Sequence, residues 1–377
     1  MKRINTIFII ILLITAGCGG HKQSTDDFVS VDVMASYSKK ELILQDFMEV
    51  EYIPLETTDE FLCQGIVLAI GKEIILVRNQ INDGNIFVFD KNGKGLRKIN
   101  RKGGSGEEYS NISVVILDED NGEMFINDVS AKRILVYDLY GKFKRSIRHK
   151  EDFQYDNIYN FGRENLICDN ASKSPFIVIS KQDGSIVNDI QIPYEQAKLP
   201  RIMKQVQVNG ISMSGGTSYR YFPIIPYQNS WILTEPSSDT IFIFSTDYNK
   251  TPFIVRTPSI QSMSLEIFLF PRIITDRYYF MEIVKKEDEF PKIDLIYDRQ
   301  EDTKYEYTFY NDDYSNKRTV DRIQKNTNDG IVFWQKLEAH DLVESYEKGE
   351  LKGKLKEIAA NLGEEDNSVI MLVKYRE

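Results

Sequence analysis

Nine residues, RKGGSGEEY from Arg101 to Tyr109, bring three glycines and two cations together and raise the question of phosphate binding. A phosphate loop needs G-x-x-x-x-G-K-[ST] between a strand and a helix, because the Lys and the helix N-terminus hold the anion. Here no Lys-Ser or Lys-Thr follows the glycines, and Glu107 and Glu108 stand where the phosphate charge would be. The dinucleotide pattern fails as well, because its last position is Tyr109. We interpret the segment as a connector whose glycines permit tight, left-handed turns.

Other patterns that support catalysis or metal binding are equally incomplete. The three histidines, His21, His149 and His340, have no partner at the spacing of zinc ligands. The run SGGTS at 214–218 lacks the residue order of a nucleophile elbow. The run DEDNG at 118–122 lacks the frame of a calcium loop and predicts a hairpin turn instead. We therefore expect no catalytic residue, no metal ligand and no cofactor.

A long insertion between residues 193 and 229 is rich in tyrosine and arginine. Tyr and Arg side chains on one loop suit stacking on a sugar or capture of a carboxylate. The alternative is an insertion that only packs over the neighbouring strands. The candidate ligand-binding residues are Arg201, Tyr219, Arg220, Tyr221 and Tyr227.

The elements that must position these residues repeat along the chain. IFVFDKNGK at 86–94 and ILVYDLYGK at 134–142 share an apolar run, an Asp, a Gly turn and a Lys, and FIVISKQDGS at 176–185 is similar. Each predicts a strand that enters a tight hairpin. A second short strand precedes each of these runs. Strands of this second kind occur six times along the chain. These strands start at Glu73, Glu123, Glu164, Ser230, Arg277 and Asp329.

A period of about fifty residues, repeated six times, predicts an all-β, six-bladed β-propeller with four strands in each blade. The strands are apolar almost throughout, as expected where neighbouring blades cover both faces of a sheet. A β-sandwich gives no such period, and a solenoid needs shorter and stricter repeats.

The last repeat contains a small helical insertion, at about 336–363, before the C-terminal strand. Leu351, Leu355, Ile358, Ala359 and Leu362 share one helical face. Gly349 is expected to interrupt an earlier helix, and Gly363 to cap the later one. The C-terminal run VIMLVKY at 369–375 predicts a buried strand that helps to complete the sixth blade and close the ring.

The N-terminal residues have the pattern of an export signal. Lys2 and Arg3 precede an apolar run, 7–14, that is too short to span a bilayer as a helix. Small residues then lead to Cys18, as in the bacterial lipobox, where the thiol is acylated. The alternative is an ordinary signal peptide with a chance cysteine. We expect a signal peptide at 1–17, lipidation of Cys18 in a tether at 18–27, and the propeller at 28–377.

Composition restricts the partners and the compartment. Lys and Arg number 47 against 57 Asp and Glu, a formal net charge of −10, which argues against nucleic acid and against electrostatic docking on anionic lipid. Membrane attachment would then come from the acyl groups, in the cell envelope and by expectation at the outer membrane, on its periplasmic or its surface side. Cys63 and Cys168 allow a disulfide, but two separate buried thiols are the interpretation we favour.

YIPLETTDEF, IFVFDKNGK, RKGGSGEEY and ILVYDLYGKF together resemble a family of six-bladed, NHL-like β-propeller lipoproteins from anaerobic gut bacteria. The 104–109 connector is similar to that family's G-x-G-P-G-E-Y, without its proline-glycine. NDGIVFWQ and EEDNSVIMLVKYRE are similar to its D-G-G-x-x-F-W-P and closing D-N-P-V segments. The likeness extends from about Tyr52 to Tyr375. It implies the fold and carries over no catalytic residue.

Three functions stay open at this point. The first is a non-catalytic, membrane-tethered propeller that binds a glycan, a peptide or a protein at one mouth of its central channel. The second is a propeller lyase or hydrolase acting on a polymer. The third is an assembly subunit of an envelope complex that uses the helical insertion for contact. The lack of a histidine constellation or a metal motif favours the first.

Overall fold

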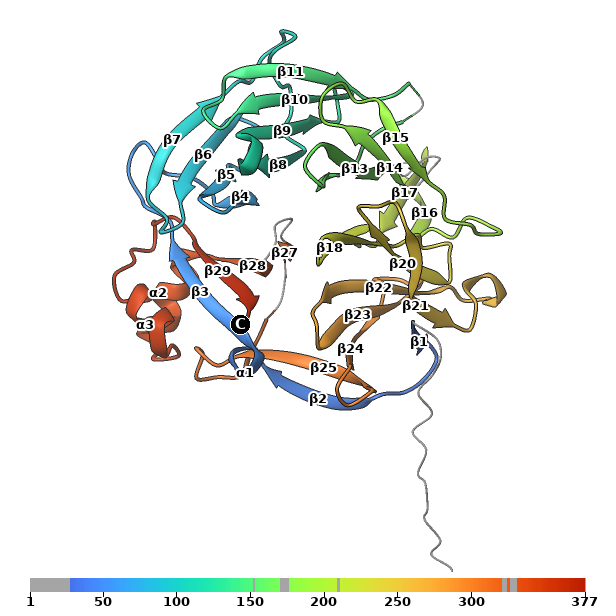
Figure 1. The fold of residues 1–377 in the computed structure, drawn as a ribbon. Helices are drawn as coiled ribbons and strands as arrows, with labels where there is room; N and C mark the ends of the chain where they lie inside the picture. The colour runs from blue at the N-terminus through green and yellow to red at the C-terminus, as the bar shows by residue number, and fades with distance from the viewer. Residues whose placement is uncertain are drawn as a thin grey trace, which may run out of the picture.

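The computed structural model describes residues 28–151, 153–169, 176–208, 211–320, 324–325 and 331–376. Within them the strands form six sheets arranged radially around a common centre, as Figure 1 shows. The structure is thus a six-bladed β-propeller, and the predicted fold class is confirmed. No helix among the described residues is long and apolar enough to cross a membrane.

The first three blades each consist of four antiparallel strands in chain order from the channel outward. Blade 1 contains β4 (Ile66–Ile70), β5 (Ile74–Arg78), β6 (Asn85–Asp90) and β7 (Gly95–Asn100). Blade 2 contains β8 (Val114–Asp118), β9 (Glu123–Asp128), β10 (Arg133–Asp138) and β11 (Phe143–Arg148). Blade 3 contains β12 (Ile158–Phe161), β13 (Asn165–Asp169), β14 (Phe176–Ser180) and β15 (Ile186–Ile190).

The other three blades receive additional strands from the N-terminal segment. Blade 4 contains β18 (Ile224–Tyr227), β19 (Ser230–Leu233), β20 (Thr240–Ser245) and β21 (Lys250–Thr257). Blade 5 contains β22 (Ile267–Ile274), β23 (Tyr278–Lys285), β24 (Lys292–Asp298) and β25 (Thr303–Asn311), with β26 (Arg318–Thr319) paired to β25. Blade 6 contains β27 (Gln324–Lys325), β28 (Ile331–Leu337), β29 (Val369–Tyr375) and β3 (Met48–Pro54).

The N-terminal segment runs along the outer edges of three successive blades (Figure 1). Strand β1 (Val29–Asp32) pairs in parallel with β21, and β2 (Ser38–Ile43) pairs in parallel with β25. After the short helix α1 (Leu44–Phe47), β3 pairs antiparallel with β29. The ring is therefore closed in blade 6 by the pairing of β3, from the N-terminal part of the chain, with the C-terminal strand β29. The C-terminal strand takes part as predicted.

The repeat found in the sequence corresponds to the second strand of each blade. The six predicted starts lie at or within two residues of β5, β9, β13, β19, β23 and β28. The hairpin turns that follow the third strand use glycine in the left-handed region, with φ of 84° at Gly93, 85° at Gly141 and 72° at Gly184. Cys63 and Cys168 are both free and buried, as favoured from the sequence.

Two short helices form the insertion before the C-terminal strand. They are α2 (Ala339–Glu347) and α3 (Gly353–Ala359), and Leu355 and Ala359 are buried against the blades. Gly349 has a φ of 69° and ends the first helix, as predicted. The prediction that Gly363 caps the second helix is wrong, because the C-cap is Ala360.

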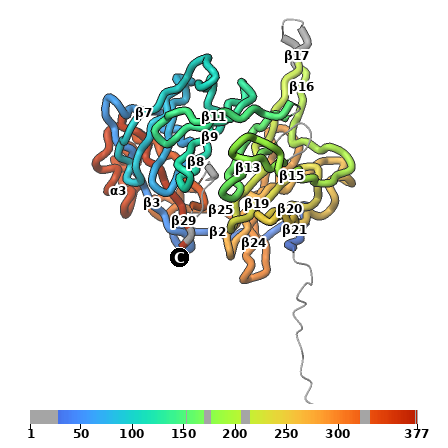
Figure 2. Tube along the Cα trace, turned by 45° about the horizontal axis from the view of Figure 1, so that its top comes forward, coloured from blue at the N-terminus to red at the C-terminus, as the bar shows by residue number. Residues whose placement is uncertain are grey.

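A two-stranded hairpin projects from the ring between blades 3 and 4 (Figure 2). It consists of β16 (Arg201–Val208) and β17 (Ile211–Ser218), which pair with each other. It lies within the long insertion that the sequence shows at this point.

The glycine-rich segment 101–109 links blade 1 to blade 2, so it is a connector. Tyr109 is fully buried, and its hydroxyl donates to the Gly84 carbonyl at 2.6 Å. The explanation offered for its glycines is wrong, because the φ angles of Gly103, Gly104 and Gly106 all lie outside the left-handed region. At Gly103 the reason is space: a Cβ there would lie 2.0 Å from a carboxylate oxygen of Glu108.

Candidate functional site

The ring has two faces that differ in their loops. One face, here called the turn face, carries the turns between the first and second strands and between the third and fourth strands of each blade. The opposite face, the connector face, carries the links between blades. A cavity of about 1150 Å³ opens on the turn face and is lined by blades 1, 2, 3, 4 and 6. We call this cavity the mouth.

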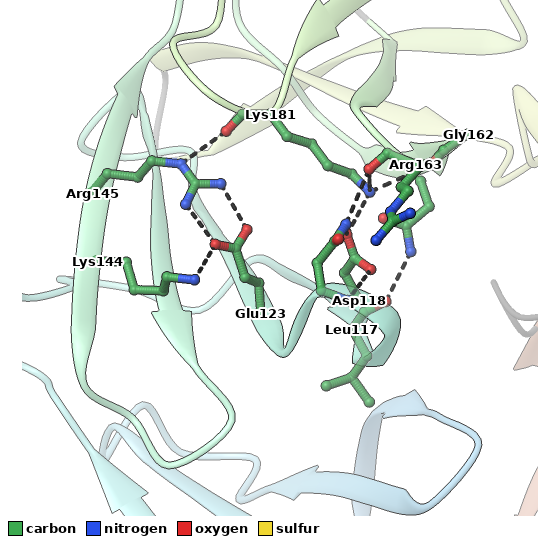
Figure 3. Close-up of polar contacts among 10 residues, drawn as sticks. Leu117, Asp118, Glu123, Lys144, Arg145, Gly162, Arg163 and Lys181 are labelled. Carbon is green, nitrogen blue, oxygen red and sulfur yellow. Dashed lines mark hydrogen bonds and ion pairs between the residues drawn. The ribbon is translucent and has the colours of Figure 1, made fainter.

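A buried ion pair joins blades 2 and 3 at the mouth (Figure 3). Lys181, directly after β14, places its Nζ 2.6 Å from Oδ2 of Asp118, at the end of β8, and both residues are buried. The same Nζ donates to the Arg163 carbonyl at 3.2 Å. Asn121 donates to Asp118 Oδ2 at 2.8 Å. The Asp118 carboxylate is therefore fully engaged in holding the two blades together.

A second ion pair, between Arg145 and Glu123, lies beside the first and holds the backbone of Lys181 in place (Figure 3). Arg145 on β11 donates from both Nη atoms to the Glu123 carboxylate, each at 2.7 Å, and its Nε donates to the Lys181 carbonyl at 2.9 Å. The Arg145 hydrogen bonds lower the pKa of Glu123 to about 2, with Lys144 contributing. Bidentate pairs of this kind are geometrically specific, so Arg145 sets the position from which Lys181 reaches the mouth.

Blade 1 holds two further carboxylates of blade 2, those of Glu119 and Asp120. The carboxylate of Glu119 accepts from the backbone N–H groups of Lys72, Glu73 and Ile74. A Cβ at Gly71 would lie 2.5 Å from this carboxylate, so only glycine allows the approach. Lys72 pairs with Asp120 at 2.6 Å.

Lys91 also lines the mouth and differs from the other cations. Its Nζ donates to the Gly71 carbonyl at 3.0 Å, and burial, with Lys374 nearby, lowers its pKa. Because Asp118, Glu119 and Asp120 are all held by cations or backbone N–H groups, none is placed as a free general acid or base. Among the described residues no group of three or more His, Cys, Asp and Glu side chains is arranged to hold a metal ion.

Blades 3 and 4 also bring to the mouth two polar atoms that have no partner among the described residues. Asn160 on β12 donates through Nδ2 to the Leu117 carbonyl at 2.8 Å, which leaves its buried Oδ1 with no partner in the described chain. Trp231 on β19 is 6% exposed, and its indole Nε1 likewise meets no acceptor there. Both residues line the mouth. They provide one unused acceptor and one unused donor.

Local structure explains why Trp231 is fixed at this place. Gln228 and Asn229 both have positive φ, 46° and 57°, the backbone of a two-residue hairpin turn between β18 and β19. The Trp231 ring then packs on Phe161 of blade 3, with centroids 4.4 Å apart. The indole is thus held between two blades, and its rotamer has little freedom.

Two of the five residues proposed from the sequence come together, on the connector face. Tyr219 and Tyr221 both stack on Phe270, with centroids 5.6 and 4.6 Å away. The Tyr219 hydroxyl donates to Glu282 at 2.7 Å, and burial raises the pKa of both tyrosines. Much of each ring is therefore used in packing.

The other predicted positions are spread over the molecule. Arg201, at the start of β16, and Arg220 are exposed. Tyr227 is buried at the opposite end of β18 from Tyr221. None of the five is among the described residues that line the mouth, and their role in ligand binding stays a prediction. Cys18 lies outside the described residues.

Sequence reasoning missed the residues of the mouth, although one signal was present. Lys91 and Lys181 follow the third strand of their blades, in FDK and ISK, at the same place in the repeat. In a propeller that place belongs to the turn face. For Trp231 and Asn160 we find no comparable signal.

One comparison with a solved structure supports the fold. A putatively exported protein of Bacteroides fragilis NCTC 9343 is 18% identical, with a TM-score of 0.64, covering 93% of this chain and 100% of its own. A member of the DUF4221 family from Bacteroides vulgatus ATCC 8482 is 8% identical, with a TM-score of 0.39, covering 88% of this chain and 98% of its own. Virginiamycin B lyase from Staphylococcus aureus is 12% identical, with a TM-score of 0.39, covering 87% and 100%.

No functionally curated protein matches the sequence. The first of these similarities supports the propeller fold, at an identity too low to indicate an activity, and the other two carry no argument. The model of a family described as a domain of unknown function, DUF4934, matches residues 28–374. That match covers almost the entire ring, from β1 to β29, and the chain therefore belongs to the DUF4934 family.

Proposed function

We propose that this chain is a non-catalytic binding propeller of the cell envelope, tethered to a membrane through an acylated Cys18, and that the mouth takes its ligand. One observation carries the proposal: the mouth combines a cavity of about 1150 Å³ with a buried donor and a buried acceptor that have no partner in the described chain. Ligand sites characteristically present a few such polar groups in a concave, preformed cavity. The similarity to a Bacteroides protein thought to be exported supports the envelope location.

The paired carboxylates of blade 2 favour binding over catalysis. Glycosidase and lyase mechanisms need carboxyl or other groups free to exchange a proton with the substrate. Asp118, Glu119 and Asp120 instead accept hydrogen bonds or ion pairs from the protein itself. The alternative of an assembly subunit has one point in its favour, Tyr346 of α2, which is 38% exposed.

Ligand binding can be followed through the protein's own fluorescence. The chain has two tryptophans, and Trp334 is buried in blade 6, so Trp334→Phe leaves Trp231 as the single reporter at the mouth. This variant should be titrated with neutral hexasaccharides (cellohexaose, xylohexaose, maltohexaose and mannohexaose) and with a library of blocked hexapeptides. A saturable change in emission with any probe supports the proposal. No change with either set would remove the mouth as a ligand site.

The tether needs its own experiment. Cells expressing the full chain are grown with radiolabelled palmitate, beside cells expressing Cys18→Ala. Label on the wild type alone, with the variant released from the membrane fraction, supports acylation of Cys18. Equal membrane association of an unlabelled wild type and the variant would show that another device attaches the protein.

A further inference from the structure

The two sides of the mouth differ in their chemistry. Blades 1 to 3 supply charged side chains, such as Lys181 and Asp118, that are paired with one another. Blade 4 supplies uncharged side chains that can both donate and accept: Asn229, Ser230 and Thr246. The unpartnered indole of Trp231 lies among these, on the same blade. A ligand in the mouth therefore meets neutral hydrogen-bonding groups on this side.

The unpartnered atoms are of opposite kinds. Trp231 Nε1 can only donate, whereas Asn160 Oδ1 can only accept. The amide of Asn160 cannot be reversed without losing the hydrogen bond from Nδ2 to the Leu117 carbonyl. A buried donor or acceptor without a partner costs free energy, so a ligand that supplies both partners is favoured.

This pair discriminates between classes of ligand. A carboxylate or a fully ionised phosphate would satisfy the Trp231 N–H, but it has no hydrogen to donate to the Asn160 oxygen. An ammonium group would satisfy Asn160 and leave Trp231 unpartnered. A hydroxyl group donates and accepts, so the hydroxyls of one neutral molecule can satisfy both atoms.

We infer that the mouth binds a neutral carbohydrate, whose hydroxyls accept from Trp231 Nε1 and donate to Asn160 Oδ1; the inference rests on the proposed function and names its ligand class. The cavity of about 1150 Å³ leaves room for several sugar residues.

The experiment uses the indole N–H of the wild-type protein as the reporter. Protein labelled with [¹⁵N]tryptophan gives two indole signals, assigned with Trp231→Phe and Trp334→Phe. Titration with the four neutral hexasaccharides should shift the Trp231 signal and slow its exchange with solvent, and leave the Trp334 signal in place. The titration itself uses the wild-type protein, and the variants serve only to assign the two signals.

Calorimetry on matched variants gives an independent readout for the sugar that binds. Trp231→Phe keeps an aromatic ring against Phe161 and removes only the donor, and should weaken binding about 10-fold. Trp334→Phe makes the same change outside the mouth and should leave the affinity unchanged. Because the ligand is uncharged, the affinity should be the same in 50 and 500 mM NaCl.

The possible outcomes distinguish this inference from the proposed function on which it rests. If the peptides shift the Trp231 signal and no sugar does, the carbohydrate class is wrong and ligand binding at the mouth stands. Sugar binding that weakens with salt, or that is unaffected by Trp231→Phe, would also overturn the inference. If no probe shifts the Trp231 signal, the proposed function fails with it.

Discussion

Lys181 of blade 3 and Asp118 of blade 2 form a buried ion pair at the mouth, with Nζ and Oδ2 2.6 Å apart and side chains 7% and 8% exposed. A pair of this kind matters most when one partner is removed, because the other charge is then left in a poorly hydrated place. The pair is thus a mechanical link between blades as well as part of the wall of the site.

Replacing Lys181 with Met should lower the free energy of unfolding by about 3 kcal/mol or more, because Asp118 loses its cation. The matched control is Lys72→Met at the exposed Lys72–Asp120 pair, also 2.6 Å long, where both side chains are 69% exposed. That change should cost less than about 1 kcal/mol. Urea denaturation followed by circular dichroism measures both. Equal losses in the two variants would contradict the link between burial and the strength of the pair.

Because His149 is buried, we expect the folded protein to lose stability in mild acid. Its Nε2 lies 2.9 Å from Asn127 Oδ1, its ring packs on Tyr155, and burial, with Lys132 nearby, lowers its pKa to about 4. Since the unfolded chain binds this proton below about pH 6.5, the folded state is penalised as the pH falls from 6.5 to 4. The contribution should reach about 3 kcal/mol by pH 4.

Melting temperatures of the wild type and His149→Asn between pH 4 and 7 test this point. Asn keeps a neutral polar group and cannot take up the proton, so the difference between the two proteins should shrink as the pH falls. The same slope in both would assign the acid sensitivity to other groups.

Removal of the N-terminal strand β1 should strongly reduce the stability of the protein. Val31 and Val33 are 0% and 4% exposed, and β1 covers the outer edge of β21 in blade 4. Removal of residues 1–37 should cost about 3 kcal/mol or more from the two valines, and it exposes a sheet edge that favours association. Removal of residues 1–27 is the control and should leave stability unchanged. Size-exclusion chromatography and thermal melting distinguish the two, and identical behaviour would show that β1 contributes little.

How much of this architecture the sequence predicts depends on how local the determining interactions are. The hairpins after the third strands follow from a glycine with positive φ close to an apolar run, as at Gly93 and Gly141, so the strand pattern and the number of blades could be predicted. Strands β1 and β2 could not, because each pairs in parallel with a strand more than two hundred residues away. The charged sequence SKKELI of β2 carries no strong strand signal of its own.

The candidate site was less predictable than the fold for a related reason. Asn160 and Trp231 belong to different blades and become neighbours of one cavity only when the ring is assembled. Tyr219 and Tyr221 show the opposite case: their composition suggested a ligand, and much of their surface is covered by Phe270. Residue type alone does not distinguish an aromatic side chain that packs from one that binds.

The final prediction concerns Gly93, where the ring closure meets the first blade. Gly93 has a φ of 84°, and a Cβ there would lie 2.0 Å from the backbone carbonyl oxygen of Pro54, the last residue of β3. Neither the strained backbone nor the carbonyl can adjust without moving a strand, so Gly93→Ala should cost more than about 3 kcal/mol.

Gly122→Ala is the control, because Gly122 has a φ of 64° with nothing within 4 Å of its Cβ position. Only the backbone strain of about 1 kcal/mol then remains. Thermal melting of the two variants separates strain from steric overlap. If Gly93→Ala is no less stable than Gly122→Ala, blade 1 can move away from β3 freely, and their contact does not help to close the ring.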